Sequence, residues 1–417
     1  MTTPDSTEVF GTIAGADEED LSTREARNGL RHIVSLSMTK IADGLIDPKL
    51  VLSWLVTSLG APAVYAGALV PIREAGALLP QMPLAHVLHR LARRKWFWVL
   101  GSAGQGIAAA LIVGAALTLE GMTAGLAICA ALALLAVCRA ACSVSYKEIL
   151  GKTVEKARRG SVTGLAGSIS SVGVLIFAGV LILGPGQSEG VVVAAIALAA
   201  GLWGLAALLF STVAERPSET DSGEGADFSV LRDNPDLWRF IIVRGLLVST
   251  ALAPPYLVVL AGGGALDRLG ALVLASALAS LVSSYVWGRL SDRSSRQVLM
   301  LSGVAGAVAM GTAVALWAVG LAEGLIAMPI VLFLLMIAYH GVRQGRSTYL
   351  VDLAPEDARA AYAAVSNTVI GGLLLLAGVV GGGAALIGAQ ATLMLFAAMA
   401  VAAALVARGL PEVEQGQ

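Results

Sequence analysis

Long apolar stretches alternate with short polar connections along most of the chain. A stretch of about 20 apolar residues spans the hydrocarbon core of a bilayer as an α-helix. Such spans must be helical, because an unpaired backbone group is costly in lipid. A hydropathy window predicts twelve spans, at residues 33–59, 63–85, 97–118, 122–146, 162–184, 190–214, 239–262, 266–288, 298–320, 325–349, 361–385 and 388–408.

Composition supports an all-α polytopic membrane protein. Hydrophobic residues make up 57% of the 417 residues and charged residues 14%, against roughly a quarter in soluble domains. This excludes a soluble or disordered protein, and unbroken apolar runs disfavour a membrane β-barrel, whose strands alternate apolar and polar residues. The net charge of −1 gives no field that favours nucleic acid. The three cysteines form no metal-ligand spacing, so neither a metal nor a cofactor is expected.

The distribution of Lys and Arg predicts the orientation. Basic residues gather in the connections after spans 2, 4, 8 and 10, whereas the opposite connections hold only Arg268. Basic connections stay in the cytoplasm, so both termini are predicted to be cytoplasmic in an inner (cytoplasmic) membrane. The basic residues are Arg90, Arg93, Arg94, Lys95, Lys147, Lys152, Lys156, Arg158, Arg159, Arg289, Arg293, Arg296, Arg346 and Arg359.

A polar segment divides the spans into six and six. Residues 215–237 are rich in acids, Ser and Gly, which is typical of a flexible cytoplasmic linker. The predicted units are therefore a first bundle at 31–214 and a second bundle at 238–408. Residues 1–30 are predicted to be an acidic cytoplasmic tail, disordered and without the apolar core of a signal peptide, and residues 409–417 a second tail.

Short matches at one spacing indicate that the two bundles are repeats. Residues 41–45 match residues 242–246 at an offset of 201, and Arg94 aligns with Arg296 at an offset of 202. Repeats of six spans enter the membrane from the same side, so they are parallel repeats about an axis along the membrane normal.

After span 8 the sequence reads Gly288-Arg289-Leu290-Ser291-Asp292-Arg293-Ser294-Ser295-Arg296. This resembles the loop signature G-x-L-x-D-R-x-x-R of the major facilitator superfamily. The resemblance implies a twelve-helix fold of two six-helix bundles, a small-molecule substrate and a monomer. In the first half Arg90 stands where the signature has its aspartate, which departs from the family pattern.

The same motif predicts a cytoplasmic latch. Its members are Gly288 for a tight turn and Asp292, Arg293 and Arg296 for ion pairs, with Asp352, Glu356 and Arg359 at the same end of the second bundle. Breaking such pairs would bias which side of the protein is open. The alternative is that these charges only solvate a loop and set the topology.

Charged residues inside the spans mark a candidate path for substrate and protons. Each costs about 2.5–3.5 kcal/mol at a helix centre, so it usually faces water or a partner. The family resemblance implies that spans 1, 4, 7 and 10 line a central cavity. The candidates are Asp43, Asp47, Arg73, Glu74, Arg139, Arg244, His340 and Arg343.

Several pairings of these charges stay open. Glu74 either faces the cavity and takes up a proton, or its neighbour Arg73 pairs with Asp47 across spans 1 and 2. Asp43 and Arg244 occupy matched positions of the repeat and are a candidate bridge between the halves. Alternatively, lysines of span 1 neutralise its acids as structural pairs.

The pattern predicts a secondary active transporter that is coupled to protons. No Walker A motif is present, and neither HExxH nor Gly-x-Ser-x-Gly occurs, so neither ATP hydrolysis nor an enzyme is expected. The arginines indicate an anionic substrate, unless they serve only to pair with the acids. The expected partners are thus a small molecule, protons and the lipid bilayer. The alternative is a non-transporting receptor, sensor or assembly factor of the same fold.

Overall fold

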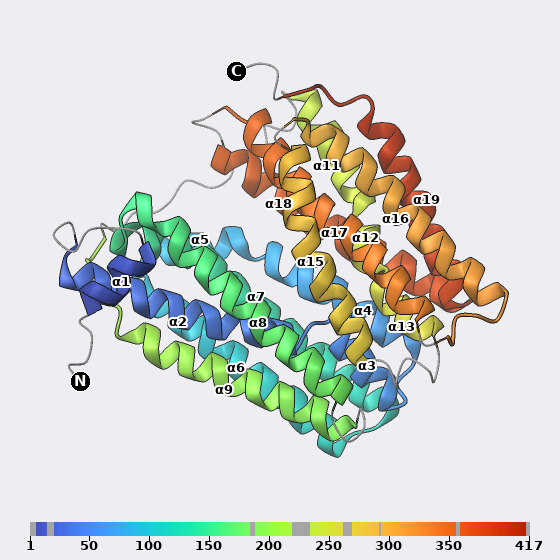
Figure 1. The fold of residues 1–417 in the computed structure, drawn as a ribbon, viewed down its shortest axis with the longest axis horizontal. Coiled ribbons are helices and arrows are strands. Elements are labelled where there is room, and N and C mark those ends of the chain that lie inside the picture. The colour runs from blue at the N-terminus through green and yellow to red at the C-terminus, as the bar shows by residue number, and fades with distance from the viewer. Residues whose placement is uncertain are drawn as a thin grey trace.

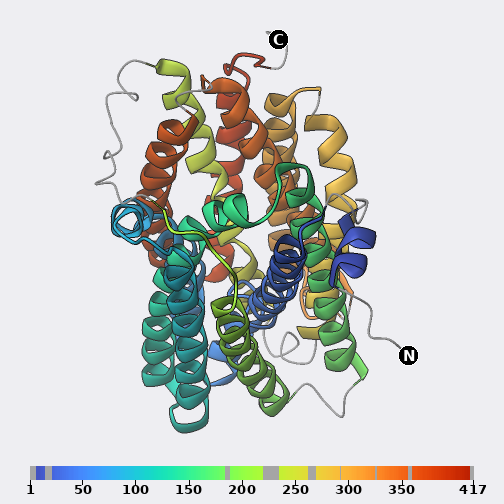
Figure 2. The ribbon, with the colours of Figure 1, turned by 90° about the vertical axis from the view of Figure 1, so that its left-hand side faces the viewer.

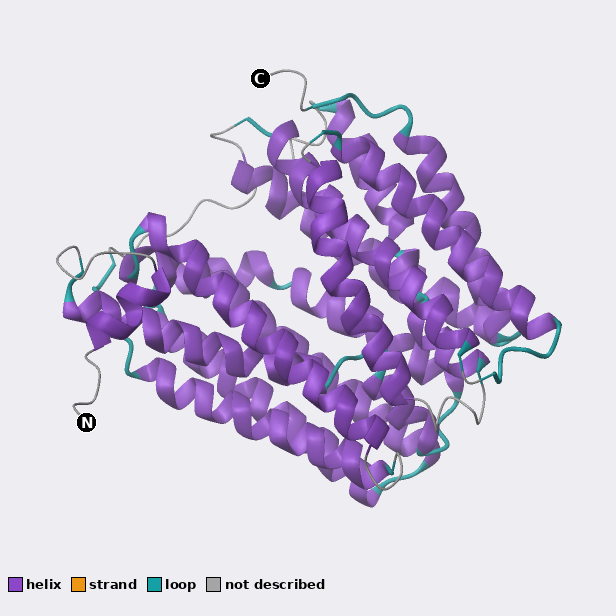
Figure 3. Cartoon of the chain, viewed as in Figure 1, coloured by secondary structure: helices purple, strands orange, loops and turns teal. Residues whose placement is uncertain are grey.

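The computed structural model describes residues 6–14, 21–183, 188–218, 234–261, 269–291, 293–324, 326–355 and 359–413. Throughout these ranges the regular structure is helical, without a strand (Figure 3). In the first half the helices are α1 (Ser6–Ala14), α2 (Thr23–Leu45), α3 (Val51–Ser58), α4 (Ala63–Leu78), α5 (Gln81–His89), α6 (Lys95–Thr118), α7 (Gly121–Thr153), α8 (Arg159–Leu183) and α9 (Glu189–Ser211). In the second half they are α11 (Pro235–Leu247), α12 (Ser249–Leu252), α13 (Pro254–Leu260), α15 (Leu269–Ser291), α16 (Ser295–Ala318), α17 (Ala327–Leu353), α18 (Arg359–Ala385) and α19 (Ala389–Ala407).

The helices form two groups that follow the two halves of the sequence (Figures 1 and 2). In the first group α6 packs on α7 and α9, and α2 packs on α8 and α9. In the second group α16 packs on α17 and α19, and α15 packs on α17. The groups lie close together where α3, α4 and α13 meet, and they diverge toward the end that carries α1, α5 and the C-terminus (Figure 1).

The most extensive contacts between the groups are those of α4 with α18 and of α8 with α15. Small residues allow the close approach, since a Cβ added at Gly378 would overlap with the ring of Pro71. At the closed end a Cβ at Gly67 would overlap with the Tyr256 hydroxyl. Glycine is therefore what lets α4 of the first half run directly against α13 and α18 of the second.

Ten helical stretches in the described part of the chain are long and apolar enough to cross a membrane. They coincide with the third to the twelfth predicted spans. The first two predicted spans are built differently: residues 33–59 are divided between α2 and α3, and residues 63–85 between the short α4 and α5. The count of twelve crossings therefore stays a prediction at these two positions.

The first span is broken near its middle. Helix α2 ends at Leu45, and the Asp47 carboxylate accepts the backbone N–H groups of Lys49 (2.8 Å) and Leu50 (3.1 Å) before α3 begins. Pro48 has no N–H to continue a helix. The predicted span 33–59 is therefore not one continuous helix, because the turn held by the Asp47 carboxylate and Pro48 separates α2 from α3.

The matched span of the second half is also broken. Helix α11 ends at Leu247, and α13 begins at the Pro254-Pro255 pair after the single turn of α12. Prolines are tolerated in the first turn of a helix, where their missing N–H is not needed. Both halves therefore carry an interrupted helix at corresponding places, a feature that marks binding sites in transporters built from repeats.

The N-terminal segment differs from the prediction of disorder. Residues Ser6–Ala14 form α1, which packs on α2 and α8. Phe10 is fully buried, and a Cβ at Gly29 would overlap with its ring. A nine-residue helix with a few apolar positions is too short a pattern for sequence analysis to separate from a polar tail. The acidic run at 17–20 lies outside the described residues.

Candidate functional site

A cavity of about 290 Å³ lies between the two halves. The first half contributes residues around the break in span 1 and from α8, and the second half contributes residues from α15 and α17. The charged and polar lining comprises Lys40, Asp43, Asp47, Lys49, Ser170, Ser171, Ser276, Ser280, Tyr339, His340 and Arg343. Four of the predicted path residues, Asp43, Asp47, His340 and Arg343, thus line one cavity together with Lys40 and Lys49.

Asp43 joins three helices of the first half. Its Oδ1 accepts a hydrogen bond from Arg73 Nη2 of α4 at 2.8 Å, and its Oδ2 accepts one from Arg139 Nη1 of α7. Asp43 therefore pairs with neither Arg244 nor a lysine of span 1, and Arg73 does not pair with Asp47. Because two guanidinium groups share one carboxylate, the trio keeps one positive charge beside the cavity.

Asp47 has a structural role in this arrangement. Its carboxylate is held by the two N–H groups that start the turn into α3, so it shapes the break while also lining the cavity. The backbone on either side of it, from Ile46 to Leu50, is the non-helical part of span 1. Such irregular backbone is tolerated at membrane depth only where it lines a cavity or is covered by protein.

Lys49 and Glu74 form the ion pair nearest to the second half. Lys49 Nζ lies 3.8 Å from Glu74 Oε1 and 4.7 Å from the centroid of the Tyr339 ring, which belongs to α17. The Lys49 side chain is 8% exposed and that of Glu74 33% exposed. This pair of the first half therefore lies at the interface, where Lys49 contacts the second half and Glu74 lines a small pocket.

The second half supplies arginines with different surroundings. Arg244 is buried and donates to Ser366 Oγ (2.8 Å) and Asn367 Oδ1 (2.9 Å) of α18. Arg343 and Arg346 make no ion pair with any described residue. A separate small pocket of about 30 Å³ is lined by Arg346, Arg343, Arg244 and Glu74. His340 meets the ring of Tyr339 edge to face.

The balance of charge around the cavity is positive. Seven cationic side chains lie in or beside it, namely Lys40, Lys49, Arg73, Arg139, Arg244, Arg343 and Arg346. The acidic side chains are Asp43, Asp47 and Glu74, and all three already have partners. The structure therefore brings the predicted path residues together, but it leaves cations rather than acids in excess.

Sequence analysis missed the uncharged part of this site. Tyr339 contacts Lys49 across the interface, and serines of α8 and α15 line opposite walls. A signal was present, because Ser276 and Ser280 share one face of an otherwise apolar span at a spacing of four. A prediction based on charged residues alone does not include these serines.

The end where the groups diverge carries a charge cluster in the first half. Arg94 forms an ion pair with Glu148 of α7, and Glu215 accepts the backbone N–H groups of Arg94 (3.2 Å) and Lys95 (2.8 Å) at the start of α6. Burial lowers the pKa of the Arg94 guanidinium, and the Glu215 carboxylate opposes that shift. The first half thus holds an ion-pair cluster at this end although its sequence departs from the motif at Arg90.

The second half holds a similar cluster with a different acid from the one predicted. Arg296 Nη2 pairs with Glu412 Oε1 at 2.6 Å, and Ser294 Oγ donates to Glu412 Oε2 at 2.7 Å. The predicted acidic partners were Asp352 and Glu356 of the connection after span 10. The acid held by Arg296 instead follows α19, much as Glu215 follows α9.

The other members of the predicted latch are not part of this cluster. Gly288 lies in the last turn of α15, Arg293 is exposed just after it, and Asp352 lies near the end of α17. Arg359 begins α18. Asp292 and Glu356 lie outside the described residues.

Comparison with known proteins follows the geometry. The family model of the Major Facilitator Superfamily matches residues 34–262, more than half of the chain. No curated protein sequence matches the chain.

Among solved structures, the nucleoside transporter NupG is 14% identical, with 92% of this chain and 98% of that one covered at a TM-score of 0.70. A POT family transporter in complex with a thioalcohol conjugated peptide is 12% identical (91% and 95% covered, TM-score 0.68). A bacterial homologue of the human lysosomal transporter Spinster, inward-facing and unoccupied, is 15% identical (93% and 98% covered, TM-score 0.62). At these identities the likeness concerns the fold.

Proposed function

The chain belongs to the Major Facilitator Superfamily, and from this premise we propose that it carries an anionic small molecule across the inner membrane by proton-coupled alternating access. Membership makes it a multi-pass membrane transporter and not an enzyme. The observation that carries the rest of the proposal is a cavity lined by both halves, placed at the break in span 1 and holding two cations, Lys40 and Arg343, that make no ion pair with the described residues.

The proposed architecture is twelve crossings in two six-helix repeats, with both termini in the cytoplasm. Matched contacts support the repeat: Gly44 of α2 faces Val174 of α8, and Gly245 of α11 faces Leu373 of α18. Gly44 and Gly245 are 201 residues apart, and each lets the first span of its half approach the fifth. With the basic connections in the cytoplasm, the diverging end of the molecule is the cytoplasmic end, and this conformation is open inward.

An anionic substrate follows from the charge balance. Arg343 lines the cavity without an acidic partner among the described residues, and Lys49 shares its charge with Glu74 at a distance of 3.8 Å. A carboxylate or similar group placed between them would gain charge-assisted hydrogen bonds in a site with little water. The serines and Tyr339 would then bind the polar body of the same molecule.

Proton coupling is assigned to Glu74. Its pairing with Lys49 is an ion pair that an anionic substrate competes for, so binding of substrate and protonation of Glu74 favour each other. Because Lys49 also contacts Tyr339 of the other half, release of this pair loosens a contact between the halves. Asp43 is a weaker candidate for a carrier, since two arginines hold its charge.

A thermal-stability screen of the purified protein tests the substrate class. Metabolites are compared as anions, cations and neutral compounds, and a ligand at 100 times its dissociation constant should add about 2.7 kcal/mol. The proposal predicts stabilisation by an anion, lost in R343Q and retained in R239Q, whose side chain is exposed and remote from the cavity. Stabilisation by cations alone, or by anions equally in R343Q, would refute the anionic substrate.

A further inference from the structure

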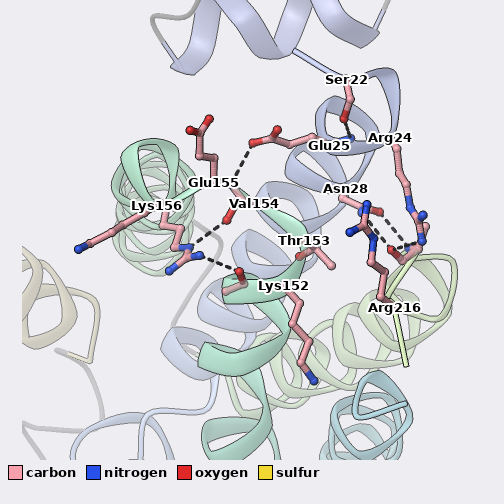
Figure 4. Close-up of a pocket in the computed structure, with 13 residues that line it drawn as sticks. Ser22, Arg24, Glu25, Asn28, Lys152, Thr153, Val154, Glu155, Lys156 and Arg216 are labelled. Carbon is pink, nitrogen blue, oxygen red and sulfur yellow. Dashed lines mark hydrogen bonds between the residues drawn. The ribbon is translucent and has the colours of Figure 1, made fainter. Parts of the chain in front are cut away.

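A second cavity, of about 390 Å³, lies in the first half and away from the interface between the halves (Figure 4). Its walls come from the start of α2, the connection between α7 and α8, and the residues that follow α9. All of its lining residues belong to the first half of the chain, from the start of α2 to the start of the linker. A ligand bound here is therefore not carried by the opening and closing of the central cavity.

The two acids at this cavity share one cationic partner. Glu25 Oε1 lies 3.0 Å from Arg158 Nη1, and Glu155 Oε2 lies 2.7 Å from the same nitrogen. Glu25 also accepts the backbone N–H of Glu155 at 2.9 Å. Arg158 does not line the cavity, and together with the two acids it leaves one negative charge there, which is fewer than the three positive charges of Arg24, Arg159 and Arg216.

Three arginines of the cavity have no carboxylate partner in the part of the chain that the structure describes. Arg24 donates to the Ala214 carbonyl at 3.1 Å, and Arg159 donates to the Val154 (2.9 Å) and Gly151 (2.7 Å) carbonyls. These carbonyls hold two of the guanidinium groups in place without cancelling their charge.

The third of these arginines, Arg216, makes no hydrogen bond or ion pair with the described residues. Arg24 and Arg216 lie on the same wall, on either side of Asn28 (Figure 4). Two neighbouring like charges repel unless an anion lies between them. Lys156 extends away from the rim of the cavity and is not counted among the groups that would bind an anion.

We propose that this cavity binds a phosphate group, held by Arg24, Arg159 and Arg216. A guanidinium group presents a planar fork of donors that matches phosphate oxygens, and three of them suit its higher charge better than a single carboxylate. The volume leaves room for the body to which the phosphate is attached. The phosphate belongs either to a soluble phosphorylated compound or to the headgroup of an anionic lipid, and the ligand ties the start of the linker to the first bundle.

The first test uses the purified full chain in detergent with inorganic pyrophosphate at constant ionic strength. The unfolding temperature of the wild type is expected to rise with the concentration of pyrophosphate until it reaches a plateau. The double variant R24Q/R216Q is expected to bind at least about tenfold more weakly. The matched control R27Q/R93Q removes two exposed arginines that do not line the cavity and should bind as the wild type does.

The second test replaces the soluble probe with vesicles of phosphatidylcholine, with or without phosphatidylglycerol. Stabilisation by phosphatidylglycerol that R24Q/R216Q abolishes identifies a lipid headgroup, whereas a response to pyrophosphate alone identifies a soluble ligand. Absence of both responses, or equal responses in R24Q/R216Q and the wild type, overturns the proposal. If the double variant does not fold, the single variant R216Q is measured in its place. Arg216 makes no hydrogen bond or ion pair with the described residues, so its replacement should not prevent folding.

Discussion

Asp43 shows how a single residue sets both the packing and the charge of the site. Its carboxylate receives Arg73 at 2.8 Å and also pairs with Arg139, while it remains 21% exposed. Removing one partner of a buried ion pair is costly because the other charges stay behind. The same residue therefore fixes α2, α4 and α7 together and leaves a net positive charge beside the cavity.

The variant D43N tests this role. We expect it to lower the free energy of unfolding by about 2–3 kcal/mol, less than a fully buried pair would lose, because the arginines keep some contact with water. The matched variant D236N breaks an exposed pair with Arg239 and should cost under about 1 kcal/mol. Denaturant unfolding in detergent measures both. Equal losses in the two variants would contradict the role of Asp43 as the centre of a buried cluster.

At the scale of helices, glycines decide which elements touch. A Cβ at Gly378 of α18 would overlap with Pro71 of α4, whereas a Cβ at Gly383 of the same helix would meet no neighbour within 4 Å. Ala has the higher helix propensity, by about 1 kcal/mol relative to Gly. The two substitutions therefore have opposite expected signs although both are in one helix.

The prediction is that G378A lowers stability, because overpacking costs about 1–3 kcal/mol, and that G383A leaves it unchanged or raises it slightly. The unfolding midpoint of the two purified variants provides the comparison. A stable G378A protein would mean that α4 and α18 are not in close contact in the membrane.

The positions of the helices were largely predictable from sequence, and their breaks were not. Ten predicted spans coincide with helices because a continuous apolar run of that length has one stable form in lipid. The break at Asp47 depends on a side chain turning back to cap two N–H groups, which hydropathy cannot register. The charged residues of the candidate site could be predicted because a charge inside a span is costly. Their pairing could not be predicted, because it depends on the rotation of each helix. The predicted bridge from Asp43 to Arg244 is therefore wrong.

For the whole molecule, the positive-inside rule predicts that the diverging end lies in the cytoplasm. In a background lacking Cys129, Cys138 and Cys142, we expect R93C to react with a membrane-impermeant thiol reagent only after the inner membrane is opened. The matched variant E120C, at the exposed connection between α6 and α7, should react in cells with an intact inner membrane once the reagent has passed the outer barrier of the cell. The reverse pattern of labelling would show that the positive-inside assignment is wrong.

The most direct test of the central claim is flux into proteoliposomes under an imposed pH gradient, using an anion identified by the stability screen. We expect that the gradient drives accumulation in the wild type, and that E74Q still binds and exchanges the anion but no longer accumulates it. The reason is that Glu74 is the acid at the interface that is paired with a single lysine and lines a small pocket. Binding without any flux in the wild type, or full gradient-driven accumulation in E74Q, would contradict the account.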